Sequence, residues 1–316
     1  MLSNLDLIKA CDRAPYPQHG LKEYESFFAR YHAFRIQGCD RPLGYIMNEV
    51  VRTFPWPKEH WRINPELRTV TLLTSPNATV EHRSEIIKKT LLAAKALNQF
   101  PELKGWRNEL FAIYGPNRVL LANIERAAVG LFGIMSYGVH VTAYVEDEKG
   151  LRIWVPRRAK TKQTWPGMLD NSIAGGLASG EKPFECMLRE ASEEASIPEH
   201  IVRSRAKACG MVSYIYIGDG SDKGSVGTLQ PDNEYVYDLR LDADTILRPC
   251  DKEVEEFKLC SVEEVQAAMA RGEFKPNCPV VLIDFFIRHG IITPENEKDY
   301  MEIVLRSHRH QILPIV

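Results

Sequence analysis

Alternating apolar and polar residues give the clearest strand signal of the chain, over residues 136–147. Every second residue from Val139 to Val145 is apolar, which is typical of a strand with one buried face. Residues 151–158 follow after a short polar break, and the two segments together predict a hairpin. Further strands are predicted at residues 42–47, 68–73, 105–115, 211–218 and 234–241.

Apolar residues spaced three and four apart predict helices elsewhere in the chain. One such helix covers residues 81–98, and a shorter one covers 124–131. Ser261 and Glu264 have the spacing of a capping box, which predicts a helix that runs to Ala270. The remaining predicted helices are 280–289 and 296–307.

The pattern changes near residue 133, where long strands replace short segments separated by turn residues. A length of 316 residues agrees with two domains, because one hydrophobic core rarely grows beyond about 250–300 residues. The sequence therefore predicts an α/β (α+β) protein. A smaller N-terminal α/β domain covers residues 1–132, and a mixed α/β domain covers residues 133–316.

A strongly acidic helix is predicted over residues 183–195. Pro183 suits its first turn, where a missing N–H costs nothing. One side of the helix is apolar and is expected to pack on the sheet. It consists of Phe184, Met187, Leu188 and Ala191. The other side carries three acidic residues one helical turn apart, namely Glu190, Glu193 and Glu194.

These like charges repel one another, and Arg189 alone cannot neutralise them. A divalent cation can neutralise them. Mg²⁺ prefers carboxylate oxygens, and substrate phosphates often complete its coordination shell. The residues therefore predict a metal and phosphate site on one helical turn. The alternative for an acidic pattern of this kind is a solvated surface.

The spacing around the helix is more specific than the charges. Glu181 follows Gly175 after five residues, and Arg189 follows Glu181 after seven more. The whole segment, GGLASGEKPFECMLREASEEASI (175–197), resembles the Nudix box, the loop–helix–loop of the Nudix hydrolases. The resemblance implies an α/β/α sandwich with a mixed sheet, a bound Mg²⁺ or Mn²⁺, and hydrolysis of a diphosphate bond in a small molecule.

Carried over residue by residue, the resemblance implies roles for the acidic helix. Glu193 and Glu194 match the principal metal ligands, and Glu190 matches a third ligand or a base. Arg189 matches the residue that orients these glutamates, and Glu181 matches a largely structural carboxylate.

Two other positions of the box concern the backbone. Gly175 and Gly176 are expected to form a tight turn that brings a carbonyl oxygen near the metal. Ser196 stands where the family usually has Gly, at a helix end that favours the left-handed conformation. We expect this departure to cost about 1 kcal/mol or less of stability and to affect catalysis little.

The family's general base is sometimes in the box and sometimes a glutamate from a later loop. Here that loop is expected at residues 250–257, with Glu253 favoured over Glu255 and Glu256. A charged strand edge is the alternative explanation for these three residues.

Four cations directly precede the box: Arg157, Arg158, Lys160 and Lys162. Arginine forks and lysine ammonium groups bind diphosphates well, so a substrate clamp is predicted, with an ordinary basic loop as the alternative. Aromatic residues are candidates for stacking on the organic part of the substrate, with core packing as the alternative. These candidates are Trp154, Trp165, Tyr214 and Tyr216.

The segments flanking the box resemble one Nudix subgroup, the thiamine-pyrophosphokinase-related proteins of fungi and plants. The matching segments are 125–141, 157–176, 233–239, 272–278 and 285–290. The resemblance implies hydrolysis of thiamine diphosphate and, preferentially, of its damaged oxo and oxy analogues. The first domain would then either shape the substrate pocket or mediate contacts in a homodimer.

Three other functions compete with this one. Hydrolysis of a nucleoside diphosphate derivative, such as ADP-ribose or an oxidised nucleotide, stays open. A catalytically silent binding module is disfavoured, because it gives no reason to keep the glutamates together. An isopentenyl-diphosphate isomerase would need a catalytic cysteine, and no cysteine occurs between residues 40 and 185.

Composition excludes several classes of protein. A formal net charge of −2 gives no reason to expect nucleic acid or an anionic membrane as a partner. The N-terminus lacks the features of a signal peptide, and no apolar stretch approaches the roughly 20 residues that span a bilayer. The seven cysteines form no CxxC pair, so we expect neither a disulfide framework nor a zinc site. The expected location is the cytoplasm.

Overall fold

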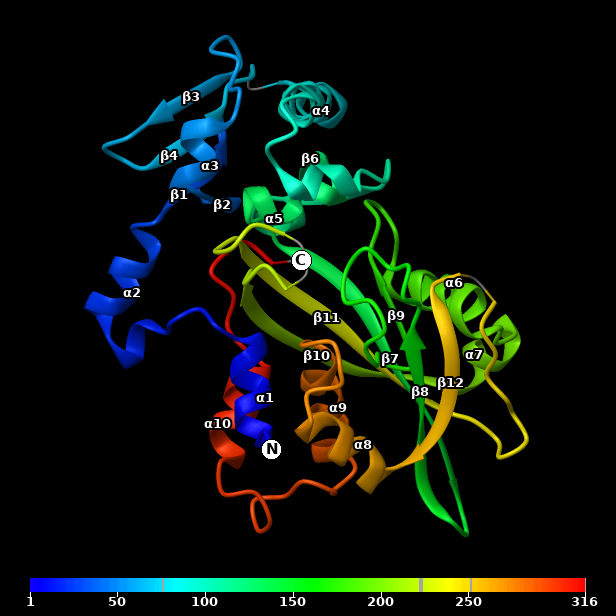
Figure 1. Ribbon diagram of the computed structural model, residues 1–316. Helices are drawn as coiled ribbons and strands as arrows, with labels where there is room; N and C mark the ends of the chain where they lie inside the picture. The colour runs from blue at the N-terminus through cyan, green and yellow to red at the C-terminus, as the bar shows by residue number, and fades with distance from the viewer. Residues whose placement is uncertain (76, 222–223, 251, 316) are drawn as a thin grey trace.

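A mixed β-sheet forms the centre of the C-terminal half of the chain (Figure 1). The computed structural model describes residues 1–75, 77–221, 224–250 and 252–315. The strand order is β10-β11-β7-β8-β12, and β9 also pairs with β7. Residues 136–144 of β7 pair in parallel with β11, while β8 and β9 are antiparallel to β7. The strands are β7 (Ser136–Asp147), β8 (Gly150–Arg158), β9 (Ile173–Gly176), β10 (Ala206–Ile217), β11 (Leu229–Arg240) and β12 (Val254–Ser261).

Helices cover both faces of this sheet, which makes the α/β/α sandwich that the sequence predicts. One face is covered by α6 (Pro183–Ala195) and α7 (Glu199–Arg205), which share a core with Val139 and Val141 of β7. The other face is covered by the remaining C-terminal helices and by the first helix of the chain (Figure 1). These are α8 (Val262–Ala270), α9 (Cys278–Arg288), α10 (Tyr300–Ser307) and α1 (Asn4–Cys11).

The position of α1 links the two ends of the chain. Leu7, Ile8 and Cys11 are buried in the same hydrophobic cluster as α8, α9 and α10. Directly after α1, the buried Asp12 accepts a hydrogen bond from Arg309 at 2.8 Å. The N-terminal helix is therefore part of the C-terminal core.

The N-terminal half contains a second, smaller sheet and a separate hairpin. The sheet has the order β2-β1-β4-β3, and β5 pairs with β6. The strands of the sheet are β1 (Tyr31–Ile36), β2 (Gly44–Met47), β3 (Trp61–Asn64) and β4 (Thr69–Leu72), and those of the hairpin are β5 (Leu110–Tyr114) and β6 (Leu120–Glu125). The helices are α2 (Leu21–Phe28), α3 (Asn48–Thr53), α4 (Val80–Ala96) and α5 (Val129–Phe132).

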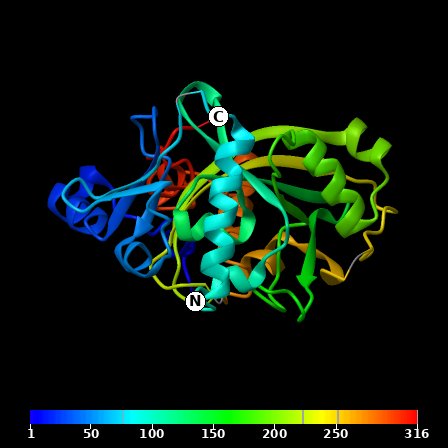
Figure 2. The same ribbon diagram turned by 90° about the horizontal axis from the view of Figure 1, so that it is seen from above.

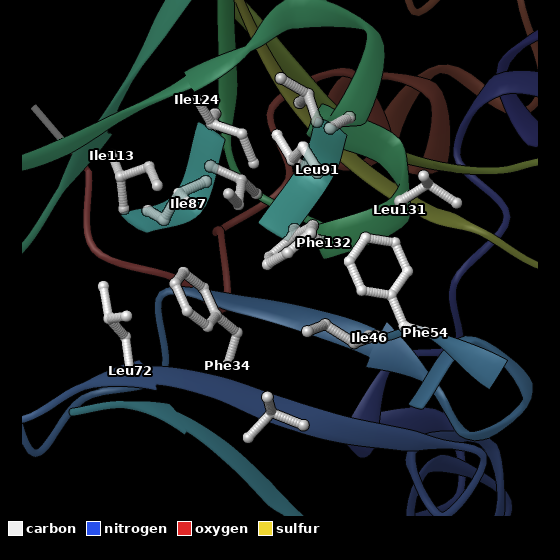
Figure 3. Close-up of a cluster of buried hydrophobic side chains, with 14 of the residues drawn as sticks. Phe34, Ile46, Phe54, Leu72, Ile87, Leu91, Ile113, Ile124, Leu131 and Phe132 are labelled. Carbon is white, nitrogen blue, oxygen red and sulfur yellow. The ribbon is translucent and has the colours of Figure 1, made fainter. Parts of the chain in front are cut away.

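The longest of these helices, α4, lies across the top of the molecule (Figure 2). Together with α5 it closes a hydrophobic core over the small sheet. Figure 3 shows labelled side chains from the sheet, α4 and α5 that meet in this core, among them Phe34, Ile46, Leu72, Ile87, Leu91 and Phe132.

Most predicted elements are present, with β7, β8, β2, β4 and α4 close to their expected bounds. The helix predicted at 124–131 is present only in part, from Arg126 onward. Its first residues belong to β6, because they pair with β5, and a short 3-10 turn at Arg126–Ala128 precedes the four-residue α5. The strand predicted at 105–115 is confined to β5, and α10 begins at Tyr300 rather than at 296.

Among the described residues, none of the helices is both long enough and apolar enough to cross a membrane.

Candidate active site

The acidic helix α6 has the predicted bounds and the predicted packing. Met187, Leu188 and Ala191 are buried against the sheet, and Phe184 packs at the edge of the same cluster. Ser196 ends the helix with a left-handed backbone, φ 55° and ψ 31°, as expected. Its hydroxyl donates to the carbonyl of Arg248 at 3.1 Å, which offsets part of the backbone strain.

Arg189 holds three carboxylates of the box together. Its guanidinium donates to both oxygens of Glu181, at 2.9 and 3.1 Å. It also donates to Glu190 at 2.6 Å and to Glu193 at 3.2 Å. A planar guanidinium can serve several oxygens at once, so one side chain fixes the positions of three acids.

Gly175 and Gly176 do not form the expected turn. Both lie in β9, opposite Val139 and Gly138 of β7, and neither has a positive φ. Their lack of a side chain serves close approach instead. A Cβ on Gly175 would lie 2.0 Å from Oε1 of Glu190, and a Cβ on Gly176 would lie 2.7 Å from the ring of Phe111.

The acids of α6 that face β9 are crowded. The backbone N–H of Ala174 donates to Glu194 at 3.1 Å. Burial, and then the charges of Glu190 and Asp170, raise the pKa of Glu194 well above its usual range. Burial also raises the pKa of Glu190, although Arg189 opposes this effect. The site therefore has an excess of buried negative charge that a cation would stabilise.

The chemistry of these donors fits a hard divalent cation. Carboxylate oxygens of Glu190, Glu193 and Glu194 and the carbonyl of Gly175 are ligands that Mg²⁺ accepts, with waters completing its shell. Within the described part of the chain, no three Asp, Glu, His or Cys side chains are already gathered into a metal-holding group. These residues fit a divalent cation, because they offer oxygen ligands and a negative charge.

A cavity of about 1060 Å³ lies beside these glutamates and is lined by both halves of the chain. Glu190 and Glu193 contribute from α6. Arg107 and Arg126 contribute from the N-terminal half, together with Phe111. Sequence reasoning missed both arginines, because no local pattern shows that the N-terminal half reaches this site.

The predicted clamp residues divide into two groups. Arg158, Lys162 and Trp165 line the cavity, whereas Arg157 and Lys160 are not among its lining residues. Arg158 is buried and already donates to Asp170 and to the carbonyls of Thr164 and Trp165. Arg158 therefore shapes the loop, and Lys162 is the more accessible cation of the two.

Arg157 has partners outside the cavity. It donates to Glu256 at 3.3 Å and to the carbonyl of Gly167 at 2.9 Å. Lys160 is exposed on the loop. Neither residue therefore lines the cavity as the predicted clamp requires.

Glu253 lies just before β12 and lines the cavity, where Lys162 forms an ion pair with it. Burial alone would raise the pKa of Glu253, but the hydrogen bond and charge of Lys162 lower it. Glu255 is exposed, and Glu256 pairs with Arg157 and Lys258. Of the three candidate bases, Glu253 is the one that lines the cavity.

The aromatic candidates also divide. Trp154 is buried in the core under α6. Tyr214 and Tyr216 of β10 line the cavity, but both are also buried in the hydrophobic cluster that contains α9, as the core-packing alternative expects. Asp232 and Glu234 of β11 line the cavity as well. The sequence predicts a strand from Glu234 and a resemblance over residues 233–239, but it assigns neither Asp232 nor Glu234 to the site. The alternation of polar residues at 232 and 234 was the signal that could have indicated a cavity-facing pair.

Comparisons with known proteins agree with the geometry. Residues 136–278 match the family model of the NUDIX domain, and residues 5–136 match that of a domain of unknown function, DUF4743. An uncharacterized protein of Saccharomyces cerevisiae is 45% identical over 244 residues, which cover 74% of this chain and 70% of that protein.

Two further relatives carry descriptive names. Nudix hydrolase 20 of Arabidopsis thaliana, described as chloroplastic, is 36% identical over 237 residues, 74% of this chain. The match covers 59% of the plant protein, less than two thirds of its length. A Nudix hydrolase of Deinococcus radiodurans is 30% identical over 133 residues, which cover 42% of this chain and 68% of the relative.

Proposed function

The chain belongs to the Nudix hydrolase family, and on that premise we propose that it hydrolyses thiamine diphosphate and its oxo and oxy analogues in a Mg²⁺- or Mn²⁺-dependent reaction. The products are the monophosphates and inorganic phosphate. The family accounts for the coarser part of this function, hydrolysis of a diphosphate bond. The metal and the substrate are the parts proposed here.

One observation carries the proposal: carboxylates and cations line the same cavity. Glu190 and Glu193 belong to one wall, and Arg107, Arg126 and Lys162 also line the cavity. A diphosphate needs both kinds of group, because its oxygens bind a metal ion and basic side chains together. An ordinary acidic surface would not be accompanied by these cations in a cavity.

The metal ligands would be Glu190, Glu193 and Glu194, with the carbonyl of Gly175. When bound there, Mg²⁺ supplies positive charge that polarises the phosphate oxygens and the attacking water. Arg189 keeps Glu190 and Glu193 in place through its hydrogen bonds. The crowding of acids around Glu194 is the observation that supports a cation at this position.

The chain's other groups bind the diphosphate and take up the proton. Arg107 and Arg126 hold phosphate oxygens from the N-terminal side of the cavity. Glu253 accepts a proton from water, and the ion pair with Lys162 keeps Glu253 ionised for that task. The water oxygen bonds to one phosphorus, and the bridging oxygen leaves with the other phosphate.

The thiamine assignment is supported by the resemblance of the flanking segments, 125–141 and 157–176 above all. The size of the cavity agrees with a substrate that carries an organic group beyond its diphosphate, since pockets for small molecules usually measure about 300–1,000 Å³. Trp165 of the loop that precedes the box also lines this cavity and offers an aromatic surface.

A substrate panel tests the proposal. Purified protein with Mg²⁺ is expected to release phosphate from oxothiamine diphosphate faster than from ADP-ribose or from oxidised nucleotides. The measurement is kcat/KM for each compound, with a chelator control for metal dependence. If ADP-ribose or a nucleotide is preferred by about tenfold, a difference of about 1.4 kcal/mol in transition-state stabilisation, the thiamine assignment is wrong.

A further inference from the structure

The β5–β6 hairpin of the N-terminal half contacts the loop that joins β9 to α6. Ser179 of this loop donates its backbone N–H to the carbonyl of Leu110 at 2.7 Å and its hydroxyl to Oδ1 of Asn123 at 2.5 Å. Leu110 begins β5, and Asn123 belongs to β6. Both strands of the hairpin therefore hold one residue of the box.

The hairpin is itself fixed to the core of the N-terminal half. The backbone N–H of Asn123 donates to the hydroxyl of Ser84 at 2.7 Å, and that hydroxyl donates to the carbonyl of Val80 in α4 at 2.6 Å. Ile113 and Ile124 of the hairpin are buried in the same hydrophobic cluster as α4. Because closely packed cores deform little, the hairpin gives the loop a firm support.

Ser179 lies in the tight turn that carries Glu181. Within this turn, the backbone N–H of Glu181 donates to the carbonyl of Ala178 at 3.0 Å, and the N–H of Ala178 donates to Oε2 of Glu181 at 3.2 Å. Gly180 has a φ of 84°, in the region that favours glycine. The two reciprocal hydrogen bonds make the turn one unit, so a shift of Ser179 also moves the carboxylate of Glu181.

Glu181 connects this turn to two of the proposed metal ligands. Both of its oxygens accept hydrogen bonds from Arg189, at 2.9 and 3.1 Å. The same guanidinium donates to Glu190 at 2.6 Å and to Glu193 at 3.2 Å. A continuous series of hydrogen bonds thus runs from α4 through the hairpin and the turn to two carboxylates of α6.

The hairpin also leads to a cation of the same cavity. Arg126 directly follows β6, and its guanidinium lies 5.4 Å from the centre of the Phe111 ring in β5. Both oxygens of Glu109 accept hydrogen bonds from Arg126, at 3.1 and 2.8 Å. One hairpin therefore carries an arginine proposed to bind the diphosphate and a contact that supports the metal ligands. Its position sets the distance between the two.

We propose that Asn123 is a positioning residue for the metal site. By accepting the hydrogen bond of Ser179, it fixes the turn that carries Glu181. Through the hydrogen bonds described above, this turn holds the carboxylates of α6 in the arrangement that binds the cation. Asn123 is not among the residues that line the cavity, so it acts without touching metal or substrate. The inference rests on the proposed function, since it concerns the metal of that reaction, and it gives the N-terminal half a second task there.

Asn123→Ala tests the proposal through the affinity for Mn²⁺, measured without substrate by titration, with electron paramagnetic resonance detecting the free ion. Removing the acceptor is expected to raise the Kd about threefold to tenfold, the range that one lost hydrogen bond accounts for. Ser179→Ala is expected to have the same effect, and the double variant is expected to bind no more weakly than either single variant. Ser179→Thr keeps the hydroxyl and is expected to bind Mn²⁺ as the wild type does.

Thr90→Val is the matched control. Thr90 of α4 accepts a hydrogen bond from Nε1 of Trp61 at 2.9 Å inside the N-terminal core, and this bond is not part of the series that leads to α6. The variant is expected to lower the free energy of unfolding in denaturant and to leave the Kd for Mn²⁺ unchanged. Equal weakening of Mn²⁺ binding in Thr90→Val and Asn123→Ala would show that only the stability of the N-terminal half matters, which overturns the proposal.

The outcomes separate this proposal from the proposed function. If the wild type binds Mn²⁺ but hydrolyses no thiamine compound, the substrate is wrong, and the Kd values still decide the role of Asn123. If the wild type and Asn123→Ala bind Mn²⁺ equally well, the metal site stands and the positioning role is wrong. If the wild type binds no Mn²⁺, both are wrong. If Asn123→Ala does not fold, the comparison of Ser179→Ala with Ser179→Thr decides.

Discussion

Replacing Gly175 by alanine is expected to displace the carboxylate of Glu190 without unfolding the protein. The added Cβ would lie 2.0 Å from Oε1, 2.2 Å from Cδ and 2.4 Å from Cγ of Glu190. Ordinary contacts between such atoms are about 3.5 Å or longer. Because Cγ and Cδ are affected as well as the terminal oxygen, the whole side chain must move by about 1 Å or more.

The magnitude follows from this displacement. Misplacing a group of an active site by about 1 Å can reduce the rate by roughly 100-fold, which corresponds to about 2.7 kcal/mol of transition-state stabilisation. The cost in folding stability is expected to be about 1–3 kcal/mol, as for other cases of overpacking. Glu190 lies at the cavity, so part of the strain can be relieved by movement toward it.

The assay is a double-mutant cycle with Glu190→Gln, using kcat/KM for the best substrate of the panel. If Gly175→Ala acts by displacing Glu190, its effect is much smaller in the Glu190→Gln background than in the wild type. Gly20→Ala is the control, because a Cβ there makes only ordinary contacts, at 3.7 and 3.8 Å. If the reductions in kcat/KM from Gly175→Ala and Glu190→Gln simply multiply in the double mutant, Gly175→Ala does not act by displacing Glu190.

Three further predictions concern single groups. Glu193→Gln is expected to abolish turnover and to change the free energy of unfolding by about 0.5 kcal/mol or less, because the side chain is exposed; full activity in this variant would exclude Glu193 as a metal ligand. Arg126→Ala is expected to raise KM for the diphosphate about tenfold with a smaller change in kcat, and steady-state kinetics that show only a kcat effect would contradict a binding role. Burial raises the pKa of Asp238, but Arg288 and His289 outweigh burial and hold this pKa below its usual value. The stability that these contacts contribute to the fold is present above the unfolded pKa of about 4 and is lost as pH falls through the lower folded pKa. Denaturant unfolding between pH 6 and pH 2 checks this, and Asp238→Asn should lose less stability with acid than the wild type does.

The sequence predicts the acidic helix well because every signal there is local. Pro183 marks its first turn, and Ser196 marks its left-handed end. Periodicity assigns Met187 and Ala191 to the buried face, and the structure agrees. The same holds for β7 and β8, where the alternation of side chains is long enough to specify both the strand and its buried face.

Local signals fail where the function of a residue depends on a distant partner. Gly175 looks like a turn residue, yet it lies in a strand and is needed for the approach of Glu190. Arg157 and Arg158 are adjacent, but strand alternation sends them to different partners, Glu256 and Asp170. No spacing in the sequence distinguishes such cases, because the pairing of β9 with β7 places Gly175 and the pairing of β8 with β12 places Arg157 opposite Glu256.

The N-terminal half is the largest part of the site that sequence patterns did not reveal. The boundary expected near residue 132 stays a prediction, but the two halves depend on one another in the structure. Leu7 and Ile8 are buried in the C-terminal core, and each contributes about 1.5–3 kcal/mol when fully buried. In the other direction, Arg107 and Arg126 of the N-terminal half line the cavity that contains Glu190. A C-terminal half without the preceding residues would therefore lack part of its core and the arginines proposed to bind the diphosphate, so we expect the proposed hydrolysis to need residues of both halves.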